Sequence, residues 1–186
     1  MKKDSNPKSD APWSVPVAAE DIPEGGLNRA IEAPPDARAA LAALADVRAV
    51  QALSADFDLT RLGASVYVSG QVRARVVQTC VVTLEPVENE VDERVDLIFA
   101  PGPAGGAAAE TAVEVKSLDP ADGPPEPLVD GKVDLGVVAT EFLILGIDPY
   151  PRKPDAQFAP PAVDEPGEHP FAVLAALKKR SGGGRS

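Results

Sequence analysis

Apolar and polar residues alternate with period two from Ser65 to Val77, and this pattern is typical of a strand with one buried face. After a turn through residues 84–86, a second such stretch follows with its parity reversed. The positions expected to face inward are Val66, Val68, Gly70, Val72, Ala74, Val76, Val87, Val91, Val95, Leu97 and Phe99. Two adjacent half-buried strands joined by a short turn predict an antiparallel hairpin.

The other face of this hairpin is charged. The second strand directs outward the side chains of Glu88, Glu90, Asp92, Arg94 and Asp96. We expect Arg73 and Arg75 of the first strand to lie near Glu90 and Asp92, with the register defined to within two residues. Carboxylates spaced along one strand face are about 7 Å apart, too far to converge on one metal ion. Two interpretations stand: a solvated sheet face, or a docking surface for a basic partner.

Two further segments have helical patterns. Proline at the first turn predicts a helix after residues 33–36 that places Ala40, Leu41, Leu44 and Val47 on one face. Asp134 is a good N-cap for a second helix over 135–147, whose apolar positions recur at helical spacing at Leu135, Val138, Phe142 and Leu145. Because almost every position of the second helix is apolar, we expect it to be buried on most sides.

Weaker patterns complete the expected fold. Val50, Ala52, Ser54 and Asp56 alternate in a strand that ends near Gly63, and Trp13, Val15 and Val17 open a first strand. The predicted class is α+β, with an antiparallel sheet built around the central hairpin, one or two packed helices and disordered termini. The predicted organisation is a disordered tail over 1–12, a domain over 13–155 and a proline-rich tether with a short helix over 156–186. Within the domain, 101–127 reads as a mobile insertion holding a short strand, Ala112–Leu118.

Composition narrows the class of protein. Proline is about twice as frequent as usual, with 20 in 186 residues, and three proline-free windows (36–85, 87–100 and 128–148) hold most of the predicted structure. No stretch approaches the roughly 18 apolar residues of a membrane span. One cysteine and the lack of a secretory signal favour a cytoplasmic protein.

Charge is localised as well. The formal net charge is −11, and residues 80–145, with 14 acids against three bases, sum to the same value. A surface this acidic repels phosphate backbones and attracts basic partners. The tail, by contrast, carries Lys178, Lys179, Arg180 and Arg185 without an acid beside them.

Residues suited to catalysis or metal binding are few. Cys80 and His169 are the strongest candidates for a nucleophile and a base, but they lie far apart in the chain and a third orienting group is not evident. We interpret them as a core or turn thiol and a surface imidazole. A zinc site needs about four Cys or His ligands, which the chain does not have. The prediction is a protein without enzymatic activity, cofactor or metal.

The last helical pattern follows Pro170, where Phe171, Leu174 and Leu177 form an apolar stripe beside Lys178 and Lys179. A helix of about ten residues is too short to be stable alone. It docks on its own domain, docks on a partner, or is a frayed end with accidental periodicity.

Three blocks resemble one family. They are Cys80-Val-Val-Thr-Leu-Glu-Pro-Val87; Asp134-Leu135, Glu141-Phe-Leu-Ile-Leu-Gly and Pro149-Tyr-Pro-Arg-Lys-Pro154; and His169-Pro-Phe-Ala-Val-Leu-Ala-Ala-Leu-Lys178. In this order they resemble the YceD family of small bacterial and plastid proteins implicated in accumulation of large-subunit (23S) ribosomal RNA. Many members have Cys-x-x-Cys at the hairpin turn, which suggests a metal or redox site. Here Thr83 takes the second position, so that property is not transferred, and the turn is interpreted as structural, with Glu85 and Pro86 fixing the start of the second strand.

The resemblance implies a non-enzymatic accessory factor for large ribosomal subunit biogenesis. We expect the acidic body, through Glu88, Glu90, Asp92 and Asp96, to bind a basic ribosomal protein or assembly factor, with the tail helix as a second contact. The alternative is a direct ribosomal RNA-binding factor that uses Arg73, Arg75, Lys178, Lys179 and Arg180. A hydrolase or nuclease ranks last because no catalytic set converges.

Overall fold

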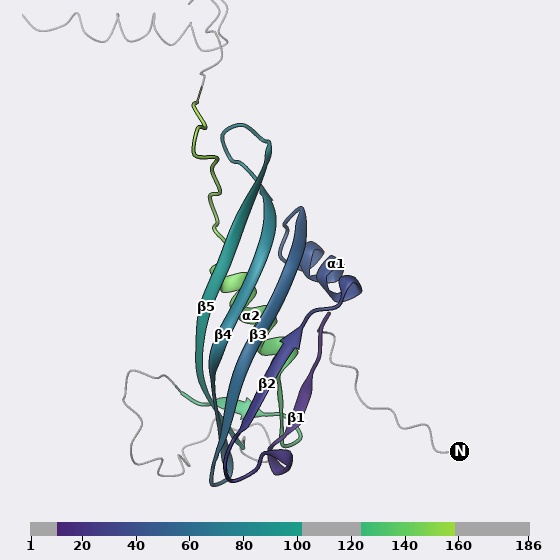
Figure 1. Cartoon of the computed structure of the whole chain (residues 1–186), viewed down its shortest axis with the longest axis vertical. Coiled ribbons are helices and arrows are strands. Elements are labelled where there is room, and N and C mark those ends of the chain that lie inside the picture. The colour runs from purple at the N-terminus through teal and green to yellow at the C-terminus, as the bar shows by residue number, and fades with distance from the viewer. Residues whose placement is uncertain (1–10, 102–123, 159–186) are drawn as a thin grey trace, which may run out of the picture.

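The computed structural model describes residues 11–101 and 124–158. In this part of the chain, one sheet has the strand order β2-β3-β4-β5-β6, and a second sheet pairs β1 with β7 (Figure 1). Neighbouring strands are antiparallel except β5 and β6, which are parallel. The strands are β1 (Pro16–Ala18), β2 (Leu27–Glu32), β3 (Ala49–Leu62), β4 (Ser65–Thr79), β5 (Pro86–Pro101), β6 (Glu126–Leu128) and β7 (Lys132–Asp134). A 3-10 turn, η1 (Ala19–Asp21), and two helices, α1 (Pro35–Leu44) and α2 (Leu135–Gly146), complete an α+β fold, as predicted.

The central hairpin is formed by β4 and β5, and its prediction is confirmed. Arg73 lies opposite Asp92 and Arg75 opposite Glu90. The residues of these strands that are less than a tenth exposed include Val66, Val68, Val72, Ala74, Val76, Val91, Val95 and Phe99. Pro86 begins β5, so its missing N–H falls at the first position of the strand, where proline is tolerated.

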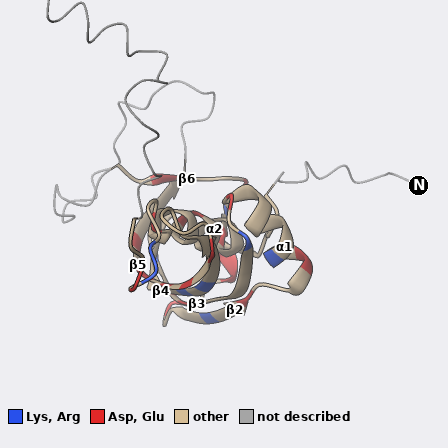
Figure 2. Cartoon of the chain, turned by 90° about the horizontal axis from the view of Figure 1, so that it is seen from above, with Lys and Arg blue, Asp and Glu red and all other residues tan. Residues whose placement is uncertain are grey.

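The sheet curves around α2, so that the helix lies within its concave side (Figure 2). The carboxylate of Asp134 caps α2 by accepting hydrogen bonds from the N–H groups of Gly136 and Val137, as the sequence predicts. Gly136 lets the first turn of the helix approach the backbone of the N-terminal segment. A Cβ atom at this position would lie 2.8 Å from the carbonyl oxygen of Trp13.

The expectation that α2 is buried on most sides is confirmed, and its exposed positions fall on one narrow side of the helix. Leu135, Val138 and Leu143 are buried against the sheet, but Val137, Ile144 and Leu145 are exposed, Leu145 by 70%. The sheet wraps around α2 (Figure 2), and β1 and the segment before it contact the helix as well, so that among the described residues only the side carrying these three exposed residues is uncovered. One side of an apolar helix therefore faces outward.

Two sequence patterns grouped residues that do not share one face. In α1, Leu41 is buried as expected, but Ala40 and Leu44 are exposed, and the helix packs on β3 through Ala37, Leu41 and Ala42. In β3, a register shift between Val50 and Ala52 reverses the alternation. Ala52, Ser54 and Asp56 therefore lie outward, and the buried positions beyond the shift are Leu53, Ala55, Phe57 and Leu59.

The ends of the predicted insertion at 101–127 belong to strands, since Pro101 ends β5 and Glu126 and Pro127 lie in β6. The predicted strand Ala112–Leu118 and the C-terminal helix lie outside the described residues. The domain boundaries at residues 12 and 155 stay predictions.

Candidate functional site

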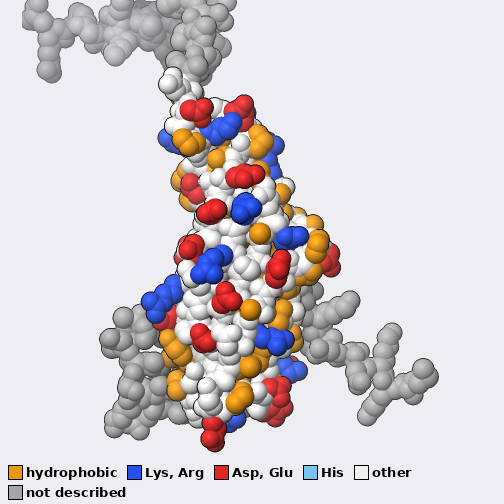
Figure 3. Space-filling view, in the orientation of Figure 1, with side chains coloured by type: hydrophobic (Ala, Val, Ile, Leu, Met, Phe, Trp, Pro, Cys, Tyr) orange, Lys and Arg blue, Asp and Glu red, His pale blue; other side chains and the backbone are white. Residues whose placement is uncertain are grey.

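The convex face of the sheet carries both signs of charge in close pairs. The guanidinium of Arg73 lies 3.5 Å from a carboxylate oxygen of Asp56 and 3.8 Å from one of Asp92. Arg94 lies 3.8 Å from Asp96. Figure 3 shows acidic and basic side chains interspersed along the whole face. In the part of the chain that the structure describes, this face therefore presents no continuous basic patch, and Arg73 is held between two carboxylates.

Negative charge is concentrated instead on β5. All four predicted partner-binding acids of this strand, Glu88, Glu90, Asp92 and Asp96, have exposed side chains on the convex face. Glu93 is half-buried on the opposite face, near Gly146 at the end of α2. We call these five residues the acidic row. Arg94 is the only basic residue of the strand.

One edge of β5 is unpaired over most of its length. Its other edge pairs with β4 from Pro86 to Phe99, whereas β6 pairs only with Phe99–Pro101. Within residues 11–101 and 124–158, no strand pairs with the outer edge of 86–98. The backbone N–H and C=O groups that point outward there have no strand partner, which makes this edge able to accept a further strand.

A groove lies at the end of β5, next to β1, β6 and the first turns of α2. Its volume is about 550 Å³. It is lined by Ser14, Pro16, Leu97, Phe99, Glu126, Pro127, Val129, Asp130, Lys132, Asp134, Val137, Val138 and Glu141. Asp134 is engaged by the N–H of Val15 at 2.8 Å and by its capping bonds. The remaining carboxylates, Glu126, Asp130 and Glu141, extend the negative charge of β5 around this corner.

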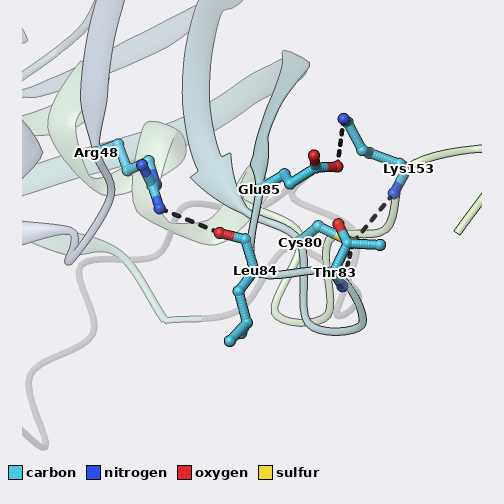
Figure 4. Close-up of polar contacts among 6 residues, drawn as sticks. All are labelled: Arg48, Cys80, Thr83, Leu84, Glu85 and Lys153. Carbon is cyan, nitrogen blue, oxygen red and sulfur yellow. Dashed lines mark hydrogen bonds and ion pairs between the residues drawn. The ribbon is translucent and has the colours of Figure 1, made fainter. Parts of the chain in front are cut away.

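At the opposite end of β5, the turn from Cys80 to Glu85 is fastened to the segment that follows α2 (Figure 4). The N–H of Val81 donates to the carbonyl of Pro151 at 2.9 Å, and Lys153 Nζ lies 2.7 Å from a carboxylate oxygen of Glu85. This ion pair lowers the pKa of Glu85 and raises that of Lys153. The turn is therefore a structural joint, as predicted.

The thiol of Cys80 is fully buried at the centre of this joint. The N–H groups of Thr83 and Lys153 each approach its sulfur at 3.5 Å. Hydrogen bonding by Thr83, with a further contribution from the Lys153 N–H, lowers the pKa of Cys80 to about 6. Such a thiol loses its proton more readily than an ordinary cysteine but has no access to solvent, so the geometry assigns it to holding the turn.

Arg48, which immediately precedes β3, supports the same turn. Its guanidinium donates to the hydroxyl of Thr79 at 2.8 Å and to the carbonyl of Leu84 at 3.3 Å. Leu84 has a left-handed backbone conformation (φ 62°) and an exposed side chain. The bond from Arg48 helps to hold this conformation, which is uncommon for a leucine.

Several predicted residues cannot be placed. Phe171, Leu174, Leu177, Lys178, Lys179 and His169 lie outside the described residues. In the described ranges, no group of three or more His, Cys, Asp or Glu side chains is arranged to hold a metal ion. No helix in the same part of the chain is long and apolar enough to cross a membrane.

Sequence reasoning missed the unpaired β5 edge, the groove and the exposed side of α2. Glu126, Asp130 and Glu141 were recognisable only as members of an acidic third of the chain. Their convergence depends on the parallel pairing of β6 with β5, which brings residue 126 beside residue 99. No local pattern encodes a contact of that range.

Together, the fold and the site define a small α+β protein with a curved sheet, an acidic strand edge and a hairpin turn fastened around one cysteine. Over residues 68–178 the chain matches the model of the family described as "Large ribosomal RNA subunit accumulation protein YceD". This match spans more than half of the chain, so the chain belongs to the YceD family, and the resemblance seen in the sequence is confirmed. No curated protein and no solved structure matches it.

Proposed function

We propose that this chain is a non-enzymatic accessory factor of large ribosomal subunit biogenesis that binds a basic ribosomal protein or assembly factor in the cytoplasm. The name of its family, which refers to accumulation of large ribosomal subunit RNA, supports the process. The acidic row of β5 is the main support for binding to a basic protein. The strand has five carboxylates and one basic residue, a composition that suits a cationic partner.

The physical route is electrostatic. A net charge of −11 repels the phosphates of RNA and speeds the approach of basic proteins. An acidic factor would neutralise the charge of a basic ribosomal protein reversibly before that protein meets RNA. Ribosomal RNA would then accumulate because its protein partners are delivered in a competent state.

The alternative function is direct binding of ribosomal RNA through Arg73, Arg75 and the basic tail. The surroundings of the two arginines weigh against it. Arg73 already lies between Asp56 and Asp92, and Arg75 is opposite Glu90. A phosphate would have to displace or approach these carboxylates, at an electrostatic cost.

The test immobilises the full chain and measures which proteins it captures from a mixture extracted from large ribosomal subunits and freed of RNA. We expect the chain to retain one or a few basic proteins at low salt and to release them as salt is raised. The variant Glu88→Gln, Glu90→Gln, Asp92→Asn, Asp96→Asn should bind about tenfold more weakly. A control with Glu20, Asp21, Glu24 and Asp36 neutralised has the same net charge and should bind as the wild type does.

Two further results would count against the proposal. Retention of no ribosomal protein by the wild type at low salt contradicts it, and retention of 23S ribosomal RNA on a filter favours the alternative. The tail helix is proposed as a second contact through Phe171, Leu174 and Leu177. If deletion of 170–186 left partner binding unchanged, the role proposed for the tail would be contradicted, whereas the role proposed for the acidic row would stand.

A further inference from the structure

The unpaired edge of β5 and the last turn of α2 lie side by side at the margin of the sheet. The outer edge of β5 is unpaired over 86–98 among the described residues. In the same part of the molecule, the last turn of α2 abuts the inner face of this strand. A Cβ atom built on Gly146 would lie 2.5 Å from Val91 and 2.8 Å from Glu93.

The last turn of α2, which meets β5, also carries exposed apolar side chains. Ile144 and Leu145, which immediately precede Gly146, are 42% and 70% exposed. The sheet curves around α2 from β2 to β5 (Figure 2), and beyond β5 it continues only through β6, which pairs with Phe99–Pro101 at one end of the strand. One more strand beside β5 would continue the curve of the sheet over this helix.

We propose that the β5 edge accepts an extended basic segment of the partner protein as an additional strand. The basic character of this partner rests on the function proposed above. The backbone of the segment pairs with the outward N–H and C=O groups of 86–98, which supplies affinity without sequence specificity. Its alternate side chains supply the specificity.

The side chains on the two faces of β5 define what such a segment must contain. On the convex face, its residues lie beside Glu88, Glu90 and Asp92, which suits lysine or arginine at every second position. On the concave face, its residues meet the outward turn of α2, which suits apolar side chains. Because the carboxylate of Glu93 is half-buried on this face, one of the segment's side chains here should be a cation.

A second copy of the chain fits this edge poorly. Pairing β5 with β5 of another molecule would bring two acidic rows together, and like charges across neighbouring strands are destabilising. Acidic side chains on an edge also discourage aggregation in general. That role alone does not account for the apolar turn of α2 left open beside the edge.

The decisive experiment uses the full chain and a synthetic peptide as long as the unpaired edge, alternating Lys with Val, with one Val near the middle replaced by Lys to meet Glu93. Its matched control is the same peptide with every backbone amide N-methylated, which keeps the charge and side chains but removes the N–H donors. We expect the unmodified peptide to bind about tenfold more tightly or better. Amide hydrogens of 86–98 should become protected from exchange only with that peptide.

Equal affinity of the two peptides would overturn strand addition while leaving an electrostatic interaction, and with it the proposed function, intact. Failure of both peptides to bind would also overturn it, whereas the proposed function is judged separately by the capture of ribosomal proteins. Concentration-dependent dimerisation that protects 86–98 would assign the edge to a second copy instead.

A variant of the chain provides a second, independent test of strand addition at the β5 edge. Glu93→Lys should weaken binding of the unmodified peptide severalfold, since it opposes the cation on the concave face. Asp36→Lys makes the same charge change on α1 and should leave binding unaltered. Equal effects of the two variants would contradict the proposal. Circular dichroism establishes that both are folded, and the peptide pair tests the wild type even where a variant is not.

Discussion

Gly70 shows what a single side chain decides in this sheet. It lies at an inward position of β4, opposite Phe57 of β3 and Val95 of β5. A Cβ atom at Gly70 would lie 2.2 Å from the carbonyl oxygen of Asp56 and 2.9 Å from the ring of Phe57. Phe57 is fully buried and among the largest side chains in the core. Glycine is therefore required at this position for β3 and β4 to approach each other.

We expect Gly70→Ala to lower the free energy of unfolding by about 3 kcal/mol, because backbone atoms and a buried ring must move to admit the methyl group. Urea unfolding followed by circular dichroism measures this. Gly25→Ala is the matched control, since no atom lies within 4 Å of its added Cβ. The control should stay within about 1 kcal/mol of the wild type. Equal stability of the two variants would show that the strands can separate at no cost.

The elements differ in how far the sequence could predict them. The β4–β5 hairpin was predictable because its period-two patterns have opposite parity on either side of a turn, and its register follows from the turn. The face of α1 was not, because alanine occurs at 37, 39, 40, 42, 43 and 45 and every side of the helix is weakly apolar. The phase of β3 depends on a bulge after Val50, which has no distinct sequence signal.

The N-cap of α2 was predictable from one residue, but the number of hydrogen bonds that this residue accepts was not. The sequence identifies Asp134 as the N-cap, whereas the structure gives its carboxylate four hydrogen-bond donors. These are the N–H groups of Val15, Gly136 and Val137 and the hydroxyl of Ser14. The same carboxylate thus starts the helix and fastens the segment that leads into β1 to it.

We expect Asp134→Ala to lower the free energy of unfolding by about 2 kcal/mol, at the upper end for an N-cap, since the bonds to the N-terminal segment are lost as well. Glu141→Ala removes an exposed carboxylate of the groove that is not part of the cap and should change stability by less than about 0.5 kcal/mol. Thermal and urea unfolding of both variants measure the difference. If the two variants lost the same stability, charge in the groove rather than capping would be responsible.

At the scale of the whole molecule, the position of charge matters more than its sum. On the convex face, arginines lie beside Asp56, Asp92 and Asp96, whereas the other members of the acidic row and the carboxylates of the groove follow one margin of the sheet. The sequence reveals the excess of acid between residues 80 and 145. It does not reveal that the excess borders an unpaired strand edge, because the edge is defined by which strands fail to pair with it.

The joint around Cys80 exists only when the whole chain is folded. The N–H donors to its sulfur come from Thr83 in the turn and from Lys153 beyond α2, which are brought together by the packing of helix on sheet. In the unfolded chain these donors are lost and the thiol returns to its ordinary pKa of 9.0, against about 6 in the fold. Between these values the unfolded state binds a proton that the folded state does not.

The free energy of unfolding should therefore contain a contribution from the Cys80 thiolate that is complete above about pH 9 and is lost as the pH falls through about 6. The stability difference between the wild type and Cys80→Ala should accordingly be larger near pH 9 than near pH 5. Urea unfolding at the two pH values measures it, and the comparison cancels titration elsewhere. Thr83→Val should shift the folded-state pKa upward and narrow this window. A difference between wild type and Cys80→Ala that is independent of pH would mean that the thiol is neutral in the fold and that its hydrogen bonds do not select the charged form.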